Sequence, residues 1–431
     1  MLLRSVWAGA AFALLALAPG CSQPAEPAQS AAAHADAATS SENFDPTGLA
    51  RFDAAFQDHA DRQVRAGYAA ILIRNGETHI VTAGVRDVAN GEPMLADTQV
   101  RLASMTKPVT AVAVMMLVES GDIALDDPVA NYIPAFAATR VATSYEPDVD
   151  GNYPTVPQAS PITIRELLTH TGGVGYIFDN DTSLGRDYME HTLYQGTGDL
   201  AEKINQLAAL PLYAQPGERW IYSYSNDILG RVVEVASGMP FQDFLQTRLF
   251  DPLGMTNTTF FVTDAQMAEA ATLYLHGEDG QLHPAYSPDN PEYRPSWASG
   301  GGGLISTAMD YSRFASMLLG NGRLGDVTIL RHASVAMMTS NHVAPSQMPP
   351  DMAGLGYGFG VGIALAGTDD TPALGIPGDY SWGGLFDTDF FVSPSTGLVA
   401  VMMTQEIPTA YMPEGRTRSW WRSAAYATLP Q

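Results

Sequence analysis

The stretch RLASMTKPVTAVAVMMLVESG, residues 101–121, predicts a long buried helix. From about Ser104 to Ser120 it is apolar on nearly all sides of a helix, and a helix of this kind is buried. Pro108 is tolerated only in the first turn of a helix, so the pattern predicts that Ser104 lies at the N-terminal end. The other predicted elements lie on either side of this buried helix in the sequence.

A helix and a hairpin are predicted on its N-terminal side. Apolar residues recur at helical spacing from Pro46 to about Asp61. Residues 68–86, YAAILIRNGETHIVTAGVR, form two β-prone runs that flank Asn75 and Gly76, a strong signal for a hairpin turn. Tight turns join antiparallel strands, so we expect an antiparallel sheet.

Helical patterns dominate the sequence that follows, and strand patterns return near the end of the chain. Two segments rich in proline, glycine and serine, residues 139–161 and 280–303, are predicted to be long surface loops. Helices are expected at residues 163–169, 199–209, 225–237, 240–248, 309–319, 331–340 and 415–427. Strands are expected at residues 355–366, 380–393 and 397–405.

These patterns predict an α/β (α+β) fold in which both ends of the chain build one antiparallel sheet flanked by helices. We expect one domain at residues 48–431. Its α/β part comprises about 48–110 and 350–431, and a mostly helical part, about 111–349, is inserted between them.

The first 21 residues are typical of an export signal. An apolar run of about 14 residues follows Arg4, which is short for a membrane span. Small residues directly before Cys21 resemble a bacterial lipoprotein signal, in which that cysteine is lipidated. We therefore expect an exported, periplasmic protein that meets a membrane only through a lipid anchor at Cys21, with plain secretion as the alternative. Residues 22–47, rich in Ala, Pro and Ser, are predicted to be a disordered tether.

The composition excludes several classes of function. The 431 residues carry 22 Lys and Arg against 46 Asp and Glu, a formal net charge of −24. A chain this acidic repels phosphate backbones, so no nucleic-acid partner is expected. The single cysteine excludes intrachain disulfides and Cys-based metal sites. The nine histidines show no tight ligand motif, so no metal or other cofactor is expected.

Ser104 and Lys107 are the first residues that could carry chemistry. Positions i and i+3 of a helix share a face, so the hydroxyl and the amine can meet. A serine is a weak nucleophile until a base takes its proton, and a lysine can serve when burial lowers its pKa. Coincidence is the alternative, but Lys107 and Lys203 are the only lysines of the chain, which makes a chance Ser-x-x-Lys match uncommon.

Tyr224 and Asn226 form a second candidate pair, just before an amphipathic helix. A phenol beside an amine can relay protons, and an amide can orient a bound carbonyl. The ordinary alternative is a core tyrosine with Asn226 as a helix cap. Tyr222 competes for the role of the phenol, but only Tyr224 has an asparagine two residues later.

Trp382, Gly383 and Gly384 open a late strand and form the third candidate group. Paired glycines let another backbone or a substrate approach the strand closely. The backbone N–H of Leu385, just beyond them, could donate to an oxyanion. A simple β-bulge is the alternative.

Together these three motifs, in this order and separation, resemble the serine β-lactamase and penicillin-binding-protein superfamily. The most similar branch is the class C β-lactamase-like one, which includes the family VIII carboxylesterases. The resemblance spans about residues 50–405. It rests on the blocks RLASMTKPVTAVAVMMLVESGDIALDDPVANYIP, ITIRELLTHTGG, PGERWIYSYSNDILGRVVE, DPLGMTNTTF and SGGGGLISTAMDYSRFASMLL.

The resemblance implies a role for each candidate residue. Ser104 resembles the acylated nucleophile, and Lys107 resembles its proton-accepting partner. Tyr224 matches the tyrosine base, and Asn226 matches the asparagine after it. The backbone N–H groups of Ser104 and Leu385 match the oxyanion hole.

The third motif departs from the usual form of this superfamily, which has Lys-Thr-Gly or His-x-Gly where this chain has Trp382-Gly383-Gly384. Lys203 cannot substitute, because Ile204 follows it. A cation at this place would pair with a substrate carboxylate, so its absence favours neutral substrates. Trp-Gly-Gly is similar to the form of the family VIII esterases.

Three further groups are predicted to be structural. His170 could serve as the base of a catalytic triad, but the resemblance places it in a structural loop. The chain also has no Gly-x-Ser-x-Gly motif, so a triad of the α/β-hydrolase kind is not expected. The stretch 145–194, with several tyrosines and phenylalanines, is interpreted as loop packing, with an acyl or alcohol pocket as the alternative. Arg416, Arg418 and Arg422 are expected on a solvated helix face.

The sequence therefore predicts an exported serine hydrolase, a carboxylesterase that hydrolyses short-chain, uncharged esters through an acyl-enzyme on Ser104. One alternative keeps these residues but acts on β-lactams or D-amino-acid peptides, and another is a catalytically idle binding protein. The expected partner is a small-molecule ester or amide. The oligomeric state and the choice between Lys107 and Tyr224 as the immediate base stay open.

Overall fold

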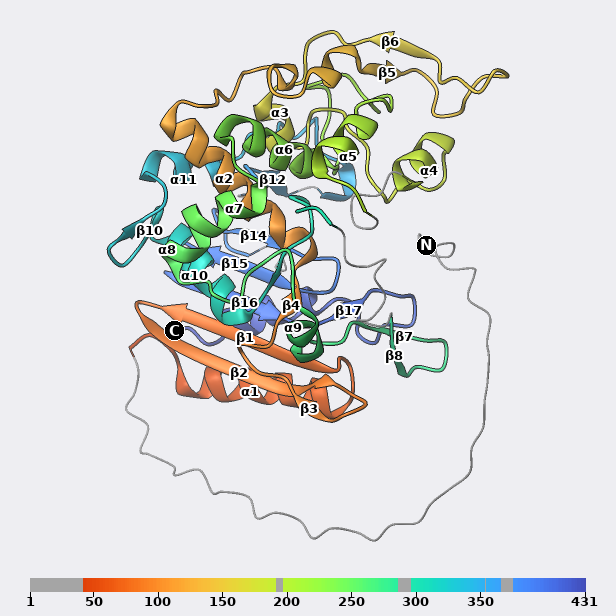
Figure 1. Cartoon of the computed structure of the whole chain (residues 1–431). Helices are drawn as coiled ribbons and strands as arrows, with labels where there is room; N and C mark the ends of the chain where they lie inside the picture. The colour runs from red at the N-terminus through yellow and green to blue at the C-terminus, as the bar shows by residue number, and fades with distance from the viewer. Residues whose placement is uncertain (1–41, 191–196, 286–295, 353, 366–374) are drawn as a thin grey trace.

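The computed structural model describes residues 42–190, 197–285, 296–352, 354–365 and 375–431 (Figure 1). The expected export signal with Cys21 and most of the expected tether lie outside these residues. In the part of the chain that is described, no helix is long and apolar enough to cross a membrane.

An eight-stranded antiparallel sheet forms the centre of the molecule (Figure 1). β1, near the N-terminus, pairs with β16, near the C-terminus, from Ala69–Met403 to Arg74–Leu398. Both ends of the chain therefore build the sheet, which confirms the predicted fold class. In sheet order the strands are β12 (Leu355–Tyr357), β13 (Gly362–Ala364), β14 (Tyr380–Gly383), β15 (Asp389–Ser393), β16 (Leu398–Met403), β1 (Gly67–Arg74), β2 (Glu77–Asp87) and β3 (Glu92–Pro93).

The hairpin between β1 and β2 lies where the sequence predicts it. Its turn residues Asn75 and Gly76 have φ angles of 49° and 82°, as a two-residue hairpin turn with left-handed residues requires. The single strand expected at residues 355–366 is instead a second hairpin, formed by β12 and β13. Gly358 lies between these strands, and a Cβ there would overlap with the backbone of Met338.

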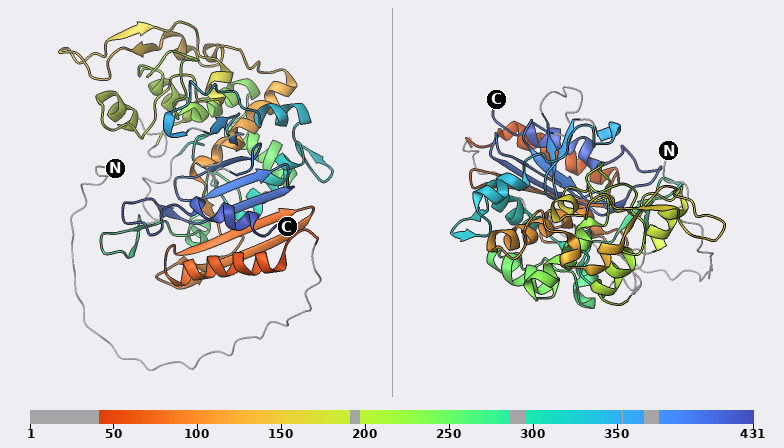
Figure 2. Two further views of the ribbon diagram at one scale, coloured as in Figure 1. Left: turned by 180° about the vertical axis from the view of Figure 1, so that it is seen from behind. Right: turned by 90° about the horizontal axis from the view of Figure 1, so that it is seen from above.

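Alternation along the central strands separates two hydrophobic cores on the two faces of the sheet. The residues of β16 divide between the cores as Val399, Val401 and Met403 on one face and Leu398, Ala400 and Met402 on the other. α1 (Pro46–Asp61) and α12 (Trp421–Tyr426) cover the second face, and Figure 2 shows α1 on the outside of the molecule. The first face supports α2 (Thr106–Ser120), which is buried as predicted and ends at Gly121 with φ 85°.

The other helices and short strands lie between β3 and β12 in the sequence, apart from β17, which follows the last long strand. The helices are α3 (Ile164–Leu168), α4 (Ser183–Glu190), α5 (Leu200–Leu207), α6 (Ser225–Ser237), α7 (Phe241–Leu245), α8 (Asp251–Leu253), α9 (Asp264–Glu269), α10 (Ala308–Leu319) and α11 (His332–Met338). The short strands are β4 (Val100–Arg101), β5 (Arg140–Ala142), β6 (Thr155–Pro157), β7 (Tyr274–His276), β8 (Leu282–Pro284), β9 (Ile305–Ser306), β10 (Arg323–Leu324), β11 (Val327–Thr328) and β17 (Glu406–Ile407). The expected loop at 139–161 thus contains the β5–β6 hairpin, and part of the loop expected at 280–303 lies outside the described residues.

The structure differs from the expected division into two parts at α10. This helix falls within the range 111–349 assigned to the helical part, but it packs on β1, β15 and β16 of the central sheet. Tyr311 and Phe314 carry this packing, and the Tyr311 ring lies 5.1 Å from that of Phe390. The amphipathic pattern of the helix predicts an apolar face but does not show which layer covers it.

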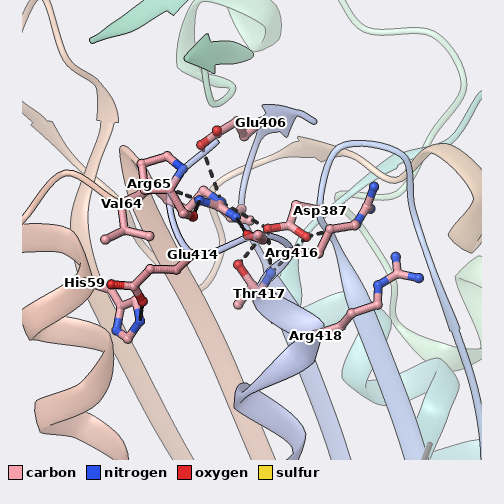
Figure 3. Close-up of polar contacts among 12 residues, drawn as sticks. His59, Val64, Arg65, Asp387, Glu406, Glu414, Arg416, Thr417 and Arg418 are labelled. Atoms are coloured by element: carbon pink, nitrogen blue, oxygen red, sulfur yellow. Dashed lines mark hydrogen bonds and ion pairs between the residues drawn. The ribbon is translucent and has the colours of Figure 1, made fainter. Parts of the chain in front are cut away.

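A buried network of charges fixes the C-terminal segment to the loop after β14 (Figure 3). Arg65 Nε lies 3.0 Å from Asp387 Oδ2 and 3.4 Å from Glu406 Oε2, and both carboxylates are buried. The Thr417 hydroxyl and backbone N–H also donate to Asp387. Burial raises the pKa of Glu406 to about 8, despite the opposing charge of Arg65. At neutral pH Asp387 is therefore the principal counterion of Arg65.

Replacing Glu406 with Gln is expected to raise the free energy of unfolding, and to raise it more at pH 8 than at pH 5. Between its ordinary pKa and about 8, the folded state keeps a proton on Glu406 that the unfolded state has released, so this carboxyl lowers the free energy of unfolding as the pH rises. Chemical denaturation of both proteins at pH 5, 6.5 and 8 measures the difference. Glu269→Gln, at an exposed position, is the control. A stability difference that does not change with pH would contradict the assignment.

Candidate active site

Ser104 lies in a short 3₁₀ turn, Ala103–Met105, that leads directly into α2. Ala103 has a φ angle of 47°, a left-handed conformation that is uncommon for a residue with a side chain. Met105 is fully buried, whereas Ser104 is only half-buried. The strained residue therefore marks a backbone turn that leaves the serine accessible at the start of a buried helix.

Lys107 lies one helical turn after Ser104, and its side chain is fully buried. Its Nζ atom lies 3.3 Å from Ser104 Oγ and 3.3 Å from the hydroxyl oxygen of Tyr176. The same nitrogen donates to the carbonyl oxygen of Gly301 at 2.6 Å. All three partners are uncharged oxygen atoms, an arrangement in which the amine can exchange a proton with the serine. The expected pairing of these two side chains is present.

Asp227 holds the loop that receives Lys107. Its Oδ1 atom accepts hydrogen bonds from Ser299 Oγ at 2.5 Å and from the Gly301 N–H at 3.1 Å. Burial raises the pKa of Asp227 to about 6, against the opposing effects of these donors and of Lys107. Gly300 must be a glycine, because a Cβ there would overlap with the backbone of Asn226. Sequence reasoning missed this support, although Asp227 directly follows a candidate and the loop is a run of glycines.

Tyr222, the competing phenol, lies beside Lys107. The lysine Nζ atom is 4.6 Å from the centroid of the Tyr222 ring, and Trp382 Nε1 donates to the Tyr222 hydroxyl at 3.3 Å. The side chain of Tyr222 is half-buried, so it remains within reach of a small molecule. Tyr222 therefore connects the Ser104–Lys107 pair with the third motif.

The tyrosine and the asparagine that the spacing selects are both fully buried. The Tyr224 hydroxyl donates to the carbonyl oxygen of Tyr188 at 3.4 Å. Asn226 Nδ2 donates to the carbonyl oxygen of Lys107 at 3.3 Å, which ties α6 to α2. Because α6 begins directly after Tyr224, this ring packs into the core between the helices. The geometry thus favours Tyr222 for the phenol and gives Asn226 a positioning role.

The third motif lies against the turn that carries Ser104. A Cβ on Gly384 would overlap with the carbonyl oxygen of Leu102, and Thr388 Oγ1 donates to that oxygen at 3.2 Å. The backbone N–H groups of Ser104 and Leu385 donate no hydrogen bond to any residue that the structure describes. Both are available to a substrate oxygen, as the resemblance implies.

His170 is buried beneath Tyr222, with their ring centroids 4.9 Å apart. Its Nδ1 atom is hydrogen-bonded to Ser223 Oγ at 2.9 Å. Burial, with a smaller effect from the charge of Lys107, lowers the pKa of His170 well below its ordinary value. A neutral histidine that packs under a tyrosine agrees with the structural role expected for it. Among the described residues no group of three or more His, Cys, Asp or Glu side chains could hold a metal ion.

The described part of the aromatic stretch 145–194 contributes Tyr176 and Phe178, which lies 6.3 Å from the Tyr222 ring, to the site and other residues to loop packing. The hydroxyl of Tyr176 contacts Lys107, as described above, and the Tyr176 ring lies 5.2 Å from the Tyr222 ring. Tyr145 instead donates to the carbonyl oxygen of Tyr213 at 2.9 Å. Residues 191–196 of the stretch lie outside the described part.

The arginines expected on a solvated helix face are only partly exposed (Arg416 and Arg418) or buried (Arg422). Arg422 is buried, and its guanidinium contacts both oxygens of Asp389 at 2.7 Å. Arg416 Nη2 donates to the carbonyl oxygen of Gly384 at 2.5 Å. The expected single helix is a 3₁₀ turn, Thr417–Ser419, followed by α12.

The geometry of a serine with a buried lysine, a tyrosine and a glycine-rich strand agrees with a family comparison. The model of the beta-lactamase family matches residues 52–420. The chain belongs to this family. It is accordingly a serine hydrolase of the β-lactamase fold.

Named relatives are similar over most of the chain. Esterase EstB of Burkholderia gladioli is 33% identical over 400 residues, which cover 86% of this chain and 94% of the relative. Penicillin-binding protein 4 of Amycolatopsis lactamdurans is 31% identical over 364 residues, 82% of this chain and 83% of the relative. The solved structure of EstCE1, a hydrolase with promiscuous acyltransferase activity, superposes with a TM-score of 0.72 at 26% identity and covers 88% of this chain and 99% of its own.

Exchange of each tyrosine for phenylalanine is expected to separate their roles. Tyr222→Phe removes a hydroxyl beside Lys107 and Trp382, so kcat should fall by about 100-fold, a usual effect of losing a general acid–base group. Tyr224→Phe removes a hydrogen bond inside the core, so the main effect should be a loss of about 1 kcal/mol in the free energy of unfolding. The measurements are steady-state hydrolysis of p-nitrophenyl butyrate and urea denaturation. A larger loss of kcat in Tyr224→Phe than in Tyr222→Phe would restore the assignment made from spacing.

Proposed function

We propose that this protein is a carboxylesterase that hydrolyses short-chain esters through an acyl-enzyme on Ser104. The observation that carries the proposal is the 3.3 Å separation of Ser104 Oγ and Lys107 Nζ, with Tyr222 between the lysine and Trp382. The relationship to an enzyme named as an esterase over 86% of the chain supports it.

Acylation would start when Lys107, with Tyr222 beside it, accepts the hydroxyl proton of Ser104. Ser104 Oγ then attacks the ester carbonyl, whose oxygen becomes negatively charged between the N–H groups of Ser104 and Leu385. The tetrahedral intermediate collapses when the alcohol leaves with a proton returned through Tyr222. The acyl group remains bonded to Ser104 Oγ.

Deacylation repeats these steps with water as the nucleophile. The same amine and phenol take a proton from the water, and the carbonyl oxygen again lies between the two N–H groups. The acid leaves and Ser104 recovers its proton. Lys107 Nζ lies 3.3 Å from Ser104 Oγ, a distance over which the proton can pass between the two groups.

Trp382 is the feature that favours an ester over a β-lactam or a cell-wall peptide. In place of the usual cation it puts an indole beside Tyr222. The alternative substrate class draws support from the 31% identity to a penicillin-binding protein. Comparing nitrocefin with p-nitrophenyl butyrate distinguishes the two, and a preference for nitrocefin would favour the alternative.

We further propose that the protein is exported and anchored to the membrane of a bacterium by a lipid on Cys21. The apolar run before this cysteine supports the proposal. Expression in a bacterium with a radiolabelled fatty acid tests it, because label should appear in the membrane fraction and disappear in Cys21→Ser. A protein without label would instead support plain secretion or retention in the cell.

The nucleophile is tested directly with a fluorophosphonate probe on protein that lacks residues 1–21. Wild type should gain a single adduct, which peptide mapping places on Ser104. Ser104→Ala should gain none and should lose ester hydrolysis by at least about 1,000-fold, while its thermal unfolding is unchanged. Lys107→Ala should react much more slowly, since the serine then lacks its base. Labelling of another residue, or full activity of Ser104→Ala, would overturn the assignment.

A further inference from the structure

The Leu385 N–H group lies in a short turn between β14 and β15. The Gly384 N–H donates to the carbonyl oxygen of Thr388 at 2.8 Å, so these two residues close the turn, and the three residues between them form its tip. The base of the turn is fixed to the active site, because Thr388 Oγ1 donates to the carbonyl oxygen of Leu102, in the turn that carries the nucleophile. The direction of the Leu385 N–H therefore depends on what fixes the tip.

Asp387, the last residue of the tip, has an unfavourable backbone conformation. Its φ angle of 64° is left-handed, a conformation that aspartate tolerates better than most residues but that still costs free energy. Such a conformation persists only when the surrounding structure holds it. The buried carboxylate of Asp387 binds Arg65, Arg416 and Thr417, none of which belongs to the turn. The shape of the tip is thus held by contacts outside the turn.

Arg65 connects the tip with both ends of the domain (Figure 3). It lies two residues before β1, and its Nε atom is 3.0 Å from Asp387 Oδ2. Its Nη2 atom donates to the carbonyl oxygen of Gly415 in the C-terminal segment. The backbone N–H of Glu406 also donates to the carbonyl oxygen of Phe386, in the middle of the tip, at 3.1 Å. Each of these contacts restricts the rotation of the peptide groups beside Leu385.

We propose that the Arg65–Asp387 pair positions the oxyanion hole, by holding the Leu385 N–H in the direction of the substrate carbonyl oxygen. The proposal rests on the proposed function, which assigns this N–H group to the oxyanion. Donors that are already oriented stabilise the tetrahedral intermediate best, because they need not move when its negative charge forms. Both side chains are buried, so they act through the turn and do not touch the substrate.

A purely structural role is the alternative, because a buried ion pair that loses one partner destabilises a protein. Asp387→Asn separates the two roles. Asparagine also tolerates a left-handed φ, so the variant removes the charge and keeps the backbone conformation accessible. Glu406 lies 3.4 Å from Arg65, and its buried Oε2 atom accepts no hydrogen bond from any described residue. It can replace Asp387 as the counterion, so the variant should fold while Arg65 turns away from the tip.

The test compares p-nitrophenyl butyrate with the matching thionoester, in which sulfur replaces the carbonyl oxygen. Sulfur is larger and accepts hydrogen bonds weakly, so the preference for oxygen reports the contact with the oxyanion hole. Asp387→Asn should lower kcat at least about tenfold with KM within about twofold, and should lower the oxygen-to-sulfur ratio of kcat/KM at least about fivefold. A loss of folded protein lowers both rates equally, so it cannot change this ratio.

Asp310→Asn is the matched control. Asp310 is also a buried aspartate, and its Oδ2 atom accepts hydrogen bonds from the backbone N–H of Asn257 at 2.7 Å and from the hydroxyl of Thr258 at 2.9 Å. Its loss should lower the melting temperature and leave the oxygen-to-sulfur ratio unchanged.

Thr417→Val is a milder change to the same contacts, for the case that Asp387→Asn does not fold. It removes the hydroxyl that donates to Asp387 at 2.6 Å and keeps the ion pair with Arg65. It should lower the ratio about twofold. An unchanged ratio in folded Asp387→Asn, or in Thr417→Val where Asp387→Asn does not fold, would overturn the proposal.

The fluorophosphonate probe separates failure of this proposal from failure of the esterase proposal. Its reaction with Ser104 places the phosphonyl oxygen where the oxyanion would lie, and it requires no ester turnover. Asp387→Asn should be labelled at least about tenfold more slowly than wild type. Slower labelling in a protein that hydrolyses no ester would overturn the esterase function and retain the positioning role. Ester turnover with equal labelling rates and equal ratios would do the reverse.

Discussion

The burial of Lys107 is the constraint on which the rest of the site depends. An amine inside a protein needs partners for its N–H groups, because burial removes the water that would otherwise bind them. This chain surrounds Nζ with three uncharged oxygen atoms, from Ser104, Tyr176 and Gly301. These partners come from three places in the sequence, so the burial of the lysine depends on long-range contacts.

The antiparallel pairing of the two chain ends positions the third motif beside the turn that carries Ser104. β1 and β16 form the middle of the sheet, and β14 follows from them through β15. The third motif therefore meets the turn of Ser104 although almost 280 residues separate them in the sequence. The same pairing brings the C-terminal segment across the sheet, where Asp387 binds Arg65 from the beginning of the domain. Stability and the geometry of the site thus depend on one set of contacts.

The sequence is sufficient to predict features that depend on local pattern. The buried helix after Ser104, the Asn75–Gly76 hairpin and the contact between Ser104 and Lys107 all follow from periodicity, turn chemistry and helix geometry. The choice between Tyr222 and Tyr224 does not follow from local pattern. It depends on where the chain turns into α6 and on the position of Trp382. The predicted exposure of the C-terminal arginines is wrong for a similar reason. The helical pattern over residues 415–427 does not reveal the break between the 3₁₀ turn and α12.

The loop around Asp227 shows a second limit of local pattern. Asp227 directly follows the candidate asparagine, so the sequence suggests that both belong to one motif. Its hydrogen-bond partners, however, are Ser299 and Gly301, in a glycine-rich loop more than 70 residues later. Asp227 does not touch Ser104 through any of these bonds; it fixes the carbonyl oxygen that receives Lys107. A residue of this kind becomes visible only when the contacts of the lysine are known.

The three residues of the third motif meet three different steric requirements. Position 382 holds a side chain long enough to reach the Tyr222 hydroxyl, which the indole does. Position 384 cannot carry a Cβ, because the carbonyl oxygen of Leu102 occupies that space. Position 383 faces the guanidinium of Arg418, so any side chain there would displace the arginine. Trp-Gly-Gly is therefore more than a motif without its usual cation. Each of its positions is fixed by a contact with a different segment of the chain.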